Sequence, residues 1–331
     1  MIIQSEQDLT AAVLAEVAHT PDARLREVLA AAVTQLHAFA RDVRLTEAEF
    51  RSICLFVAQA GQATNPSHNE VVLAAGSLGL SALVCLINNG SGGATTANLM
   101  GPFWRQGSPA TLSGGSIVRS PTPGAPLFVQ AWVRDTQGAP VLGAEVDVWH
   151  SSAEGFYENQ DPSQAEMNLR GKFTTDAAGG IAFRSIKPVG YPVPVNGPVG
   201  ALLRAQGRHN LRPAHIHFMI HKPGFKTQFS QVYSSDDPHL ETDVQFGVTR
   251  ALVGQYVLHH EPAGPPQGRI PECGARRCAG DRAAAADVSG DWYSLEHHFT
   301  IEPGVASLPA PPITAKTTGE RPALMVLTRA E

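Results

Sequence analysis

The sequence predicts a mainly β protein that begins with an α-helical domain and continues as an antiparallel β-sandwich. Over about the first hundred residues, apolar side chains recur every three or four positions, which is typical of helices. From Pro109 onward the pattern changes to short alternating runs separated by glycine and proline, as in sandwiches and barrels. We therefore expect a helical domain at residues 1–105 and a β-sandwich domain, which would be the catalytic one, at residues 106–331.

The helical domain has several segments in which apolar residues follow a helical period. Pro21 is placed to start one of them, since proline is favoured in the first turn of a helix. Asn65 and Pro66 are placed to interrupt the helical pattern. The expected helices cover residues 6–18, 22–40, 46–60 and 70–86.

The β domain shows alternation of period two in short segments. After Val257 the composition turns to proline, glycine and alanine without periodicity, so we expect an irregular excursion at residues 258–290. The tail, rich in proline and threonine, is expected to wrap the surface or to be partly disordered. The expected strands cover residues 127–134, 144–150, 171–176, 180–186, 215–221, 226–233 and 292–301.

Charge and hydropathy exclude several classes of partner. The formal net charge of -5 leaves no basic stripe that could neutralise a phosphate backbone. The N-terminus carries acidic residues where a secretory signal would carry lysine or arginine. No apolar stretch reaches the roughly twenty residues of a membrane-spanning helix. We therefore expect no nucleic-acid partner, no membrane embedding and a cytoplasmic location.

The four cysteines are too few for a disulfide framework in a chain of 331 residues. Cys54 and Cys85 lie in apolar, helix-like surroundings, where a buried thiol is the ordinary explanation. Cys273 and Cys278 have a loosely zinc-like separation, but the only histidine pair that follows is at 297–298, at an unmatched spacing. An exposed loop is therefore preferred to a zinc knuckle.

Two histidines and two tyrosines are candidate metal ligands. His215 and His217 lie in an alternating segment, so both imidazoles project from the same face of a strand and can share one ion. A structural role explains such a pair about equally well when it stands alone. Tyr157 follows an expected strand, and Tyr191 lies in a loop fixed by proline and glycine. Simple ring packing explains either tyrosine better when it is taken alone.

Several motifs follow one another in a fixed order between Gly101 and Tyr256. They are GPFW, VWHSSAEGFY, RGKFTTD, GYPVPVNGPVG, GRHNLRPAHIHF and FSQVY. In this order and spacing the segment resembles the intradiol dioxygenases of the catechol and hydroxyquinol type. The helical N-terminal region is similar to the dimerising domain of that family, so the resemblance also implies a homodimer, with bound phospholipid between the subunits.

The resemblance implies one non-haem Fe(III) held by Tyr157, Tyr191, His215 and His217. Phenolate oxygens suit this ion, because ferric iron is hard and highly charged. The implied reaction is intradiol cleavage of a catechol-type aromatic diol by O2, giving a cis,cis-muconate-type product.

Three residues are implied in catalysis beyond metal binding. Tyr191 would leave the metal when substrate binds and accept a substrate proton. Arg212 would stabilise negative charge on the substrate ring, since a guanidinium does not deprotonate. Gln231 would lie near the metal.

The segment between the two domains is expected to line the substrate pocket. GPFW preceded by TTANLM resembles hydroxyquinol 1,2-dioxygenases more than simple catechol enzymes, and this favours hydroxyquinol as substrate. Cys85, however, stands where hydroxyquinol enzymes typically carry an aspartate, and a thiol is a poor hydrogen-bond partner. Catechol or a substituted catechol stays the alternative. The expected pocket residues are Leu99, Met100, Gly101, Pro102, Phe103 and Trp104, with Cys85.

Two other functions compete with this interpretation. A metal-free β-sandwich module could line an apolar ligand cavity with Tyr157 and Tyr191, but such a module has no need of the histidine pair nearby. A zinc hydrolase could use His215 and His217, although zinc seldom takes tyrosinate and no third carboxylate or histidine is evident.

Overall fold

The computed structural model describes residues 2–66, 68–89, 93–260 and 290–328. The chain divides into two compact units, Met1–Ala58 and Gln59–Glu331. Most of the expected excursion at 258–290, with Cys273 and Cys278, lies outside the described residues. A functional boundary near residue 105 stays a prediction.

The first unit consists of helices. It contains α1 (Glu6–Val17), α2 (Ala23–Asp42) and most of α3 (Glu47–Ala63). The side chains of Ser5 and Asp22 accept hydrogen bonds from the first turns of α1 and α2, which explains where these helices begin. Neither α1 nor α2 contains a buried residue, so their apolar side chains are left partly or fully exposed within this chain.

After the end of α3, the second unit contains a broken helix where a single one was expected at residues 70–86. The prediction was wrong because Gly79 adopts a φ of +74°, a left-handed conformation that ends a helix. The pattern of apolar residues continues through this break and conceals it. Two helices result, α4 (Glu70–Ser77) and α5 (Leu80–Asn89). Across the described residues, no single helix is long and apolar enough to cross a membrane. The α4–α5 pair reaches that length and apolarity only when its two helices, bent by 74°, are counted together.

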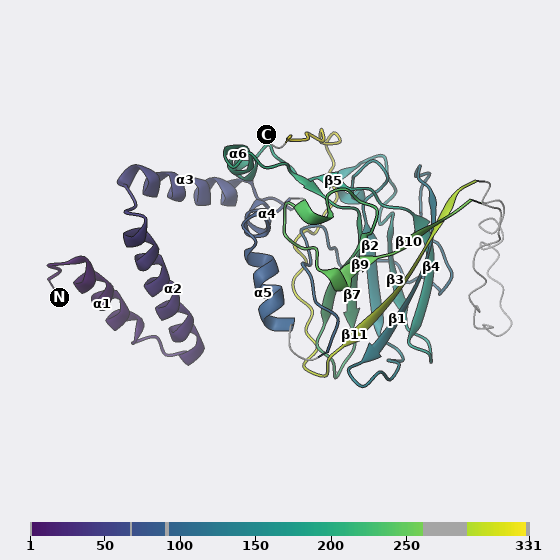
Figure 1. The fold of residues 1–331 in the computed structure, drawn as a ribbon, viewed down its shortest axis with the longest axis horizontal. Coiled ribbons are helices and arrows are strands. Elements are labelled where there is room, and N and C mark those ends of the chain that lie inside the picture. The colour runs from purple at the N-terminus through teal and green to yellow at the C-terminus, as the bar shows by residue number, and fades with distance from the viewer. Residues whose placement is uncertain (1, 67, 90–92, 261–289, 329–331) are drawn as a thin grey trace. The chain divides into compact units, whose positions relative to one another are not determined.

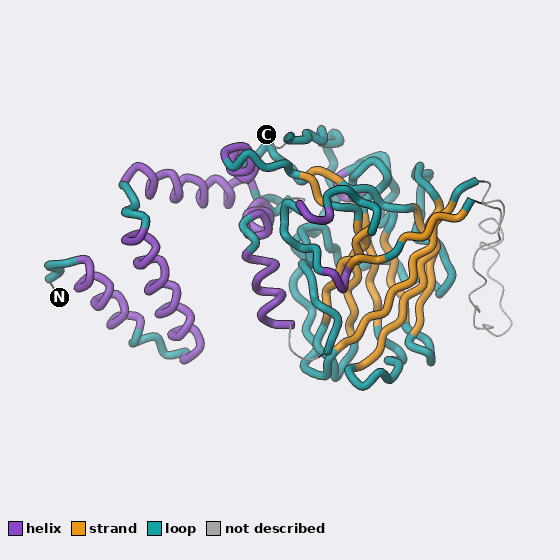
Figure 2. Tube along the Cα trace, in the orientation of Figure 1, coloured by secondary structure: helices purple, strands orange, loops and turns teal. Residues whose placement is uncertain are grey.

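Two sheets pack face to face in the second unit and form the expected sandwich (Figure 1, Figure 2). The first sheet has the order β10 (Tyr256–His259), β11 (Trp292–Ile301), β1 (Pro126–Asp135) and β4 (Gly180–Ile186). The second has the order β3 (Arg170–Thr174), β2 (Glu145–His150), β7 (His215–His221), β8 (Gln228–Ser234) and β9 (Val253–Gly254).

The sheets are mixed, whereas the sequence predicted antiparallel ones. Strand β1 pairs with β11 in parallel, and β8 pairs with β9 in parallel. Alternation of apolar residues shows which face of a strand is buried but says nothing about the direction of its neighbour. The long chain between β1 and β11 provides the crossover that a parallel pair requires.

Strand β7 has two buried faces with different roles. Ile216, Phe218 and Ile220 point into the apolar core between the two sheets. His215 and His217 therefore point to the opposite side, because successive side chains alternate across a strand. This outer face of the second sheet is the place where the candidate site is built.

Candidate metal centre

The histidine pair is positioned by the strands on both sides of β7. In the register of the sheet, His217 stands opposite Trp149 of β2 and Gln231 of β8. The indole of Trp149 stacks on the His217 ring, with centroids 4.6 Å apart and planes 7° apart. His217 Nδ1 is buried without a hydrogen-bond partner among the described residues, so stacking is what orients this ring.

The two tyrosines reach the same point from different segments. Tyr157 follows β2 by a short loop and precedes a 3₁₀ turn, Glu158–Gln160, whose Gln160 side chain accepts from the Tyr157 N–H. Tyr191 lies on β5 (Tyr191–Pro192), which pairs with β6 (Leu211–Arg212) so that Tyr191 stands opposite Arg212. Because β6 leads directly into β7, this short antiparallel pair brings Tyr191 beside His215.

The four side chains converge through their donor atoms. Tyr157 Oη lies 3.2 Å from Tyr191 Oη, 3.1 Å from His217 Nε2 and 3.4 Å from His215 Nε2. The two Nε2 atoms are 3.1 Å apart. Donor atoms that share one metal ion through bonds of about 2 Å lie at separations of this size. All four expected ligands are thus brought together, and their spacing fits a bound metal ion.

The protonation states of the two histidines are also compatible with a bound cation. Burial, with the Arg212 charge second, lowers the pKa of His215 to about 3, and burial lowers the pKa of His217. Both imidazoles are therefore neutral. His215 Nδ1 donates to Pro213 O at 2.7 Å, which leaves the lone pair of Nε2 facing the centre. Burial raises the pKa of Tyr157 and of Tyr191, so without a cation these phenols stay protonated.

The donor types narrow the choice of metal. Among the described residues, no three His, Cys, Asp or Glu side chains form a group that could hold an ion. Any ion at this point must therefore use the phenol oxygens. Zinc hydrolases bind their ion through histidine, carboxylate or cysteine, so the donor set disfavours that alternative and fits a hard ferric ion.

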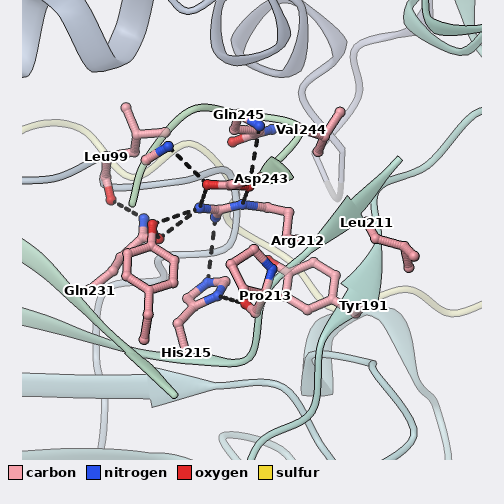
Figure 3. Close-up of polar contacts among 12 residues, drawn as sticks. Leu99, Tyr191, Leu211, Arg212, Pro213, His215, Gln231, Asp243, Val244 and Gln245 are labelled. Atoms are coloured by element: carbon pink, nitrogen blue, oxygen red, sulfur yellow. Dashed lines mark hydrogen bonds and ion pairs between the residues drawn. The ribbon is translucent and has the colours of Figure 1, made fainter. Parts of the chain in front are cut away.

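Arg212 is buried beside the donor atoms in a dense polar network (Figure 3). Its Nε and Nη2 bind the Asp243 carboxylate at 3.1 and 3.2 Å, and Nη2 also donates to Gln231 Oε1 and Tyr233 Oη at 2.9 Å. Gln231 Nε2 donates to Leu99 O at 2.7 Å. Arg212 thus lies beside the donor set and Gln231 lies against Arg212, while their catalytic roles stay predictions. Sequence reasoning missed Asp243 and Tyr233.

The segment expected to line the pocket runs along this site. Gly101 has a φ of +73°, and a Cβ there would lie 3.1 Å from His217 Cε1, so the backbone passes directly over the His217 ring. The Phe103 ring stacks on Tyr157 at 4.5 Å. Leu99, Phe103 and Trp104 are buried. Cys85 is half-buried on α5, where burial raises its thiol pKa, and its place in the pocket stays a prediction.

A buried ion cluster supports the Tyr157 loop. The Glu158 carboxylate accepts from Arg105 Nη1 at 2.9 Å and from Arg170 Nε at 2.7 Å. Glu158 and Arg170 are almost fully buried. The sequence offered a faint signal, since a charged residue directly after Tyr157 and another at the start of a strand are unusual in a core.

The C-terminal tail packs behind both tyrosine loops. Ile313 belongs to the apolar cluster that contains Tyr157 and Tyr191. Arg321 lies over the Phe156 ring at 3.9 Å. Asn210 donates to Met325 O at 2.9 Å and also accepts from the tail. The expectation that the tail wraps the surface is confirmed for its described part.

Comparison with known proteins decides the family. A family model described as "Dioxygenase" matches residues 100–269, and one described as "Catechol dioxygenase N terminus" matches residues 22–96. Hydroxyquinol 1,2-dioxygenase of Nocardioides simplex is 40% identical over 265 residues, which cover 79% of this chain and 88% of the relative. The chain belongs to the intradiol ring-cleavage dioxygenases.

Further comparisons agree with this placement of the dioxygenase. 6-Chlorohydroxyquinol 1,2-dioxygenase of Cupriavidus pinatubonensis is 38% identical over 253 residues, covering 76% of this chain and 91% of the relative. The solved structure of hydroxyquinol 1,2-dioxygenase from Pseudomonas putida DLL-E4 superimposes with a TM-score of 0.75 at 34% identity, covering 90% of this chain and 99% of that one. The family and fold predicted from the motifs are confirmed.

Proposed function

We propose that this dioxygenase opens the ring of hydroxyquinol between two hydroxylated carbons, using one Fe(III) held by Tyr157, Tyr191, His215 and His217. The observation that carries the proposal is the convergence of two phenol oxygens and two neutral imidazole nitrogens on one point. The alternative substrate is catechol or a substituted catechol.

The surrounding residues have defined tasks in this reaction. When bound, ferric iron would supply a Lewis acid that takes the two substrate oxygens and makes the ring reactive toward O2. In the iron-loaded enzyme Tyr191 would be a phenolate, and its Oη would accept a proton from a substrate hydroxyl. Arg212 faces the donor set with Nη1, 3.4 Å from His215 Nε2, where it stabilises negative charge on the ring. The four ligands are only 1% to 3% exposed, so their surroundings strengthen these electrostatic interactions.

Hydroxyquinol is preferred over catechol on two grounds. The relatives described above act on hydroxyquinol or its chloro derivative by name. The GPFW segment, which resembles that of hydroxyquinol enzymes, contains Phe103, whose ring stacks on Tyr157. Cys85 argues for the alternative, because its thiol would bind a third hydroxyl weakly. The ratio of kcat/KM for hydroxyquinol to kcat/KM for catechol therefore measures how strongly the pocket favours hydroxyquinol.

The function is tested by oxygen uptake with hydroxyquinol, catechol and 4-methylcatechol compared side by side on the iron-loaded enzyme. We expect uptake with one O2 per ring opened and the highest kcat/KM for hydroxyquinol. We also expect a wine-red protein, because phenolate-to-iron(III) charge transfer absorbs visible light. Stoichiometric iron without a visible band would contradict the two-tyrosine site, and no ring opening of any diol would contradict the activity.

Replacement of Tyr191 by phenylalanine tests its role as a proton acceptor. Three donors remain, so the variant should keep part of its iron, while kcat falls by about 10²- to 10⁴-fold. Tyr256→Phe is a matched control, because this tyrosine is also buried but donates to Val232 O. Ring-cleavage kinetics of Tyr191→Phe that equal those of the control would refute the role.

We also propose a homodimer formed through the helical domain, with phospholipid bound between the subunits. The exposed apolar side chains of Leu25, Leu36 and Phe39 on α2 support a partner surface. The cytoplasmic location stays a prediction.

A further inference from the structure

One nitrogen of the Arg212 guanidinium, Nη1, takes no part in the contacts with Asp243, Gln231 and Tyr233 and faces the four candidate ligands. A guanidinium has five N–H groups in a rigid plane. The Nε and Nη2 groups are used by Asp243, Gln231 and Tyr233. Nη1 points toward the donor atoms and lies 3.4 Å from His215 Nε2. The lone pair of that ring nitrogen faces the centre, so a bound ion would occupy it, and Nη1 would then face the side of the ion where substrate binds.

Asp243 holds the Arg212 guanidinium in place. Its carboxylate binds Arg212 through both oxygens, and each oxygen also accepts a backbone N–H, from Gln245 at 3.2 Å and from Gly247 at 2.8 Å. The carboxylate is therefore held by its own turn. Both partners of the pair are 2% exposed at the side chain, where a charge is costly unless it is matched.

The backbone of the same turn lies close to the Arg212 guanidinium. A Cβ on Gly247 would lie 2.5 Å from Tyr233 Oη and 3.1 Å from Arg212 Nη2. Glycine therefore allows the turn to approach these groups closely. The carboxylate and the turn together allow the guanidinium one orientation, because a bidentate pair fixes its plane.

We propose that Asp243 is a positioning residue of the ring-opening reaction, which holds the plane of Arg212 so that Nη1 faces the bound substrate. This inference rests on the proposed function. Asp243 acts through Arg212 and takes no part in holding the metal, since its oxygens are already used by the arginine and the two amides. Its loss should therefore affect turnover more than iron binding.

The experiment compares iron-loaded, full-length Asp243→Asn with wild type and with Asp176→Asn. The control is closely matched, because Asp176 also accepts N–H groups two and four residues ahead, from Ala178 and Gly180, but it lies on the β3–β4 turn. We measure iron content, the visible band, substrate affinity without O2 from the shift of that band, and kcat. For Asp243→Asn we expect kcat to fall about 10- to 100-fold while iron content and anaerobic affinity change less than about threefold. Asp176→Asn should keep the wild-type kcat.

Gly247→Ala provides a second test that leaves the carboxylate in place. The added methyl must displace the tips of Tyr233 and Arg212, so it should reproduce the fall in kcat with iron retained. If Asp243→Asn does not fold or does not hold iron, this variant decides the question. An unchanged kcat in the variant that folds with iron would overturn the positioning role. A wild-type enzyme that opens no diol would overturn the proposed function, and this inference with it.

Discussion

His217→Ala is expected to lose most of its iron and, with it, ring cleavage. The imidazole supplies one of four donor atoms, and its Nε2 lies 3.1 Å from both Tyr157 Oη and His215 Nε2. Loss of groups that merely orient a ligand weakens metal binding by about 10- to 100-fold, so loss of a ligand should cost at least about 100-fold. Iron per chain after gel filtration and oxygen uptake per chain measure both effects.

His221→Ala is the matched control for this experiment. It lies on the same face of the same strand, four positions further along, and its Nδ1 pairs with Thr227 Oγ1 rather than with the donor set. It should keep iron and activity. Equal iron content in the two variants would show that His217 is no ligand and that the convergence of the four side chains has another purpose.

The local parts of the fold were predictable because they depend on local patterns. The strands expected at 180–186, 215–221 and 292–301 coincide with β4, β7 and β11. Alternation along β7 also showed that His215 and His217 share a face. The direction of neighbouring strands was not predictable in this way, because it depends on long crossovers that leave no mark in a single strand.

The site residues also divide into those that local sequence reveals and those that depend on distant contacts. Tyr157, Tyr191 and the histidine pair were found through motifs, because their resemblance to a known family includes order and spacing. Asp243 was missed, since it lies 31 positions from Arg212 and carries no local signal of pairing. Such partners are chosen by tertiary contact, where a buried guanidinium requires a carboxylate. The antiparallel pair of β5 and β6, with two residues per strand, was too short to show alternation.

Glu158→Gln is expected to destabilise the enzyme strongly. The substitution keeps the volume of the side chain and removes the charge that Arg105 and Arg170 share. The Arg170 side chain is 1% exposed, and burial already lowers its pKa. Removing one partner of a buried ion pair typically costs about 3–5 kcal/mol. Chemical denaturation of the variant should show a loss of this size in the free energy of unfolding.

Glu166→Gln is the control for this experiment, because it removes an exposed salt bridge to Arg105 instead of a buried one. Glu166 also binds Arg105, at 2.7 Å, but its side chain is 58% exposed, so its loss should cost no more than about 1 kcal/mol. Because Glu158 directly follows Tyr157, only Glu158→Gln should also weaken the visible band of the iron-loaded protein. Equal stabilities of the two variants would mean that the cluster is open to water, and the Tyr157 loop would then owe its position to Phe103 and the tail instead.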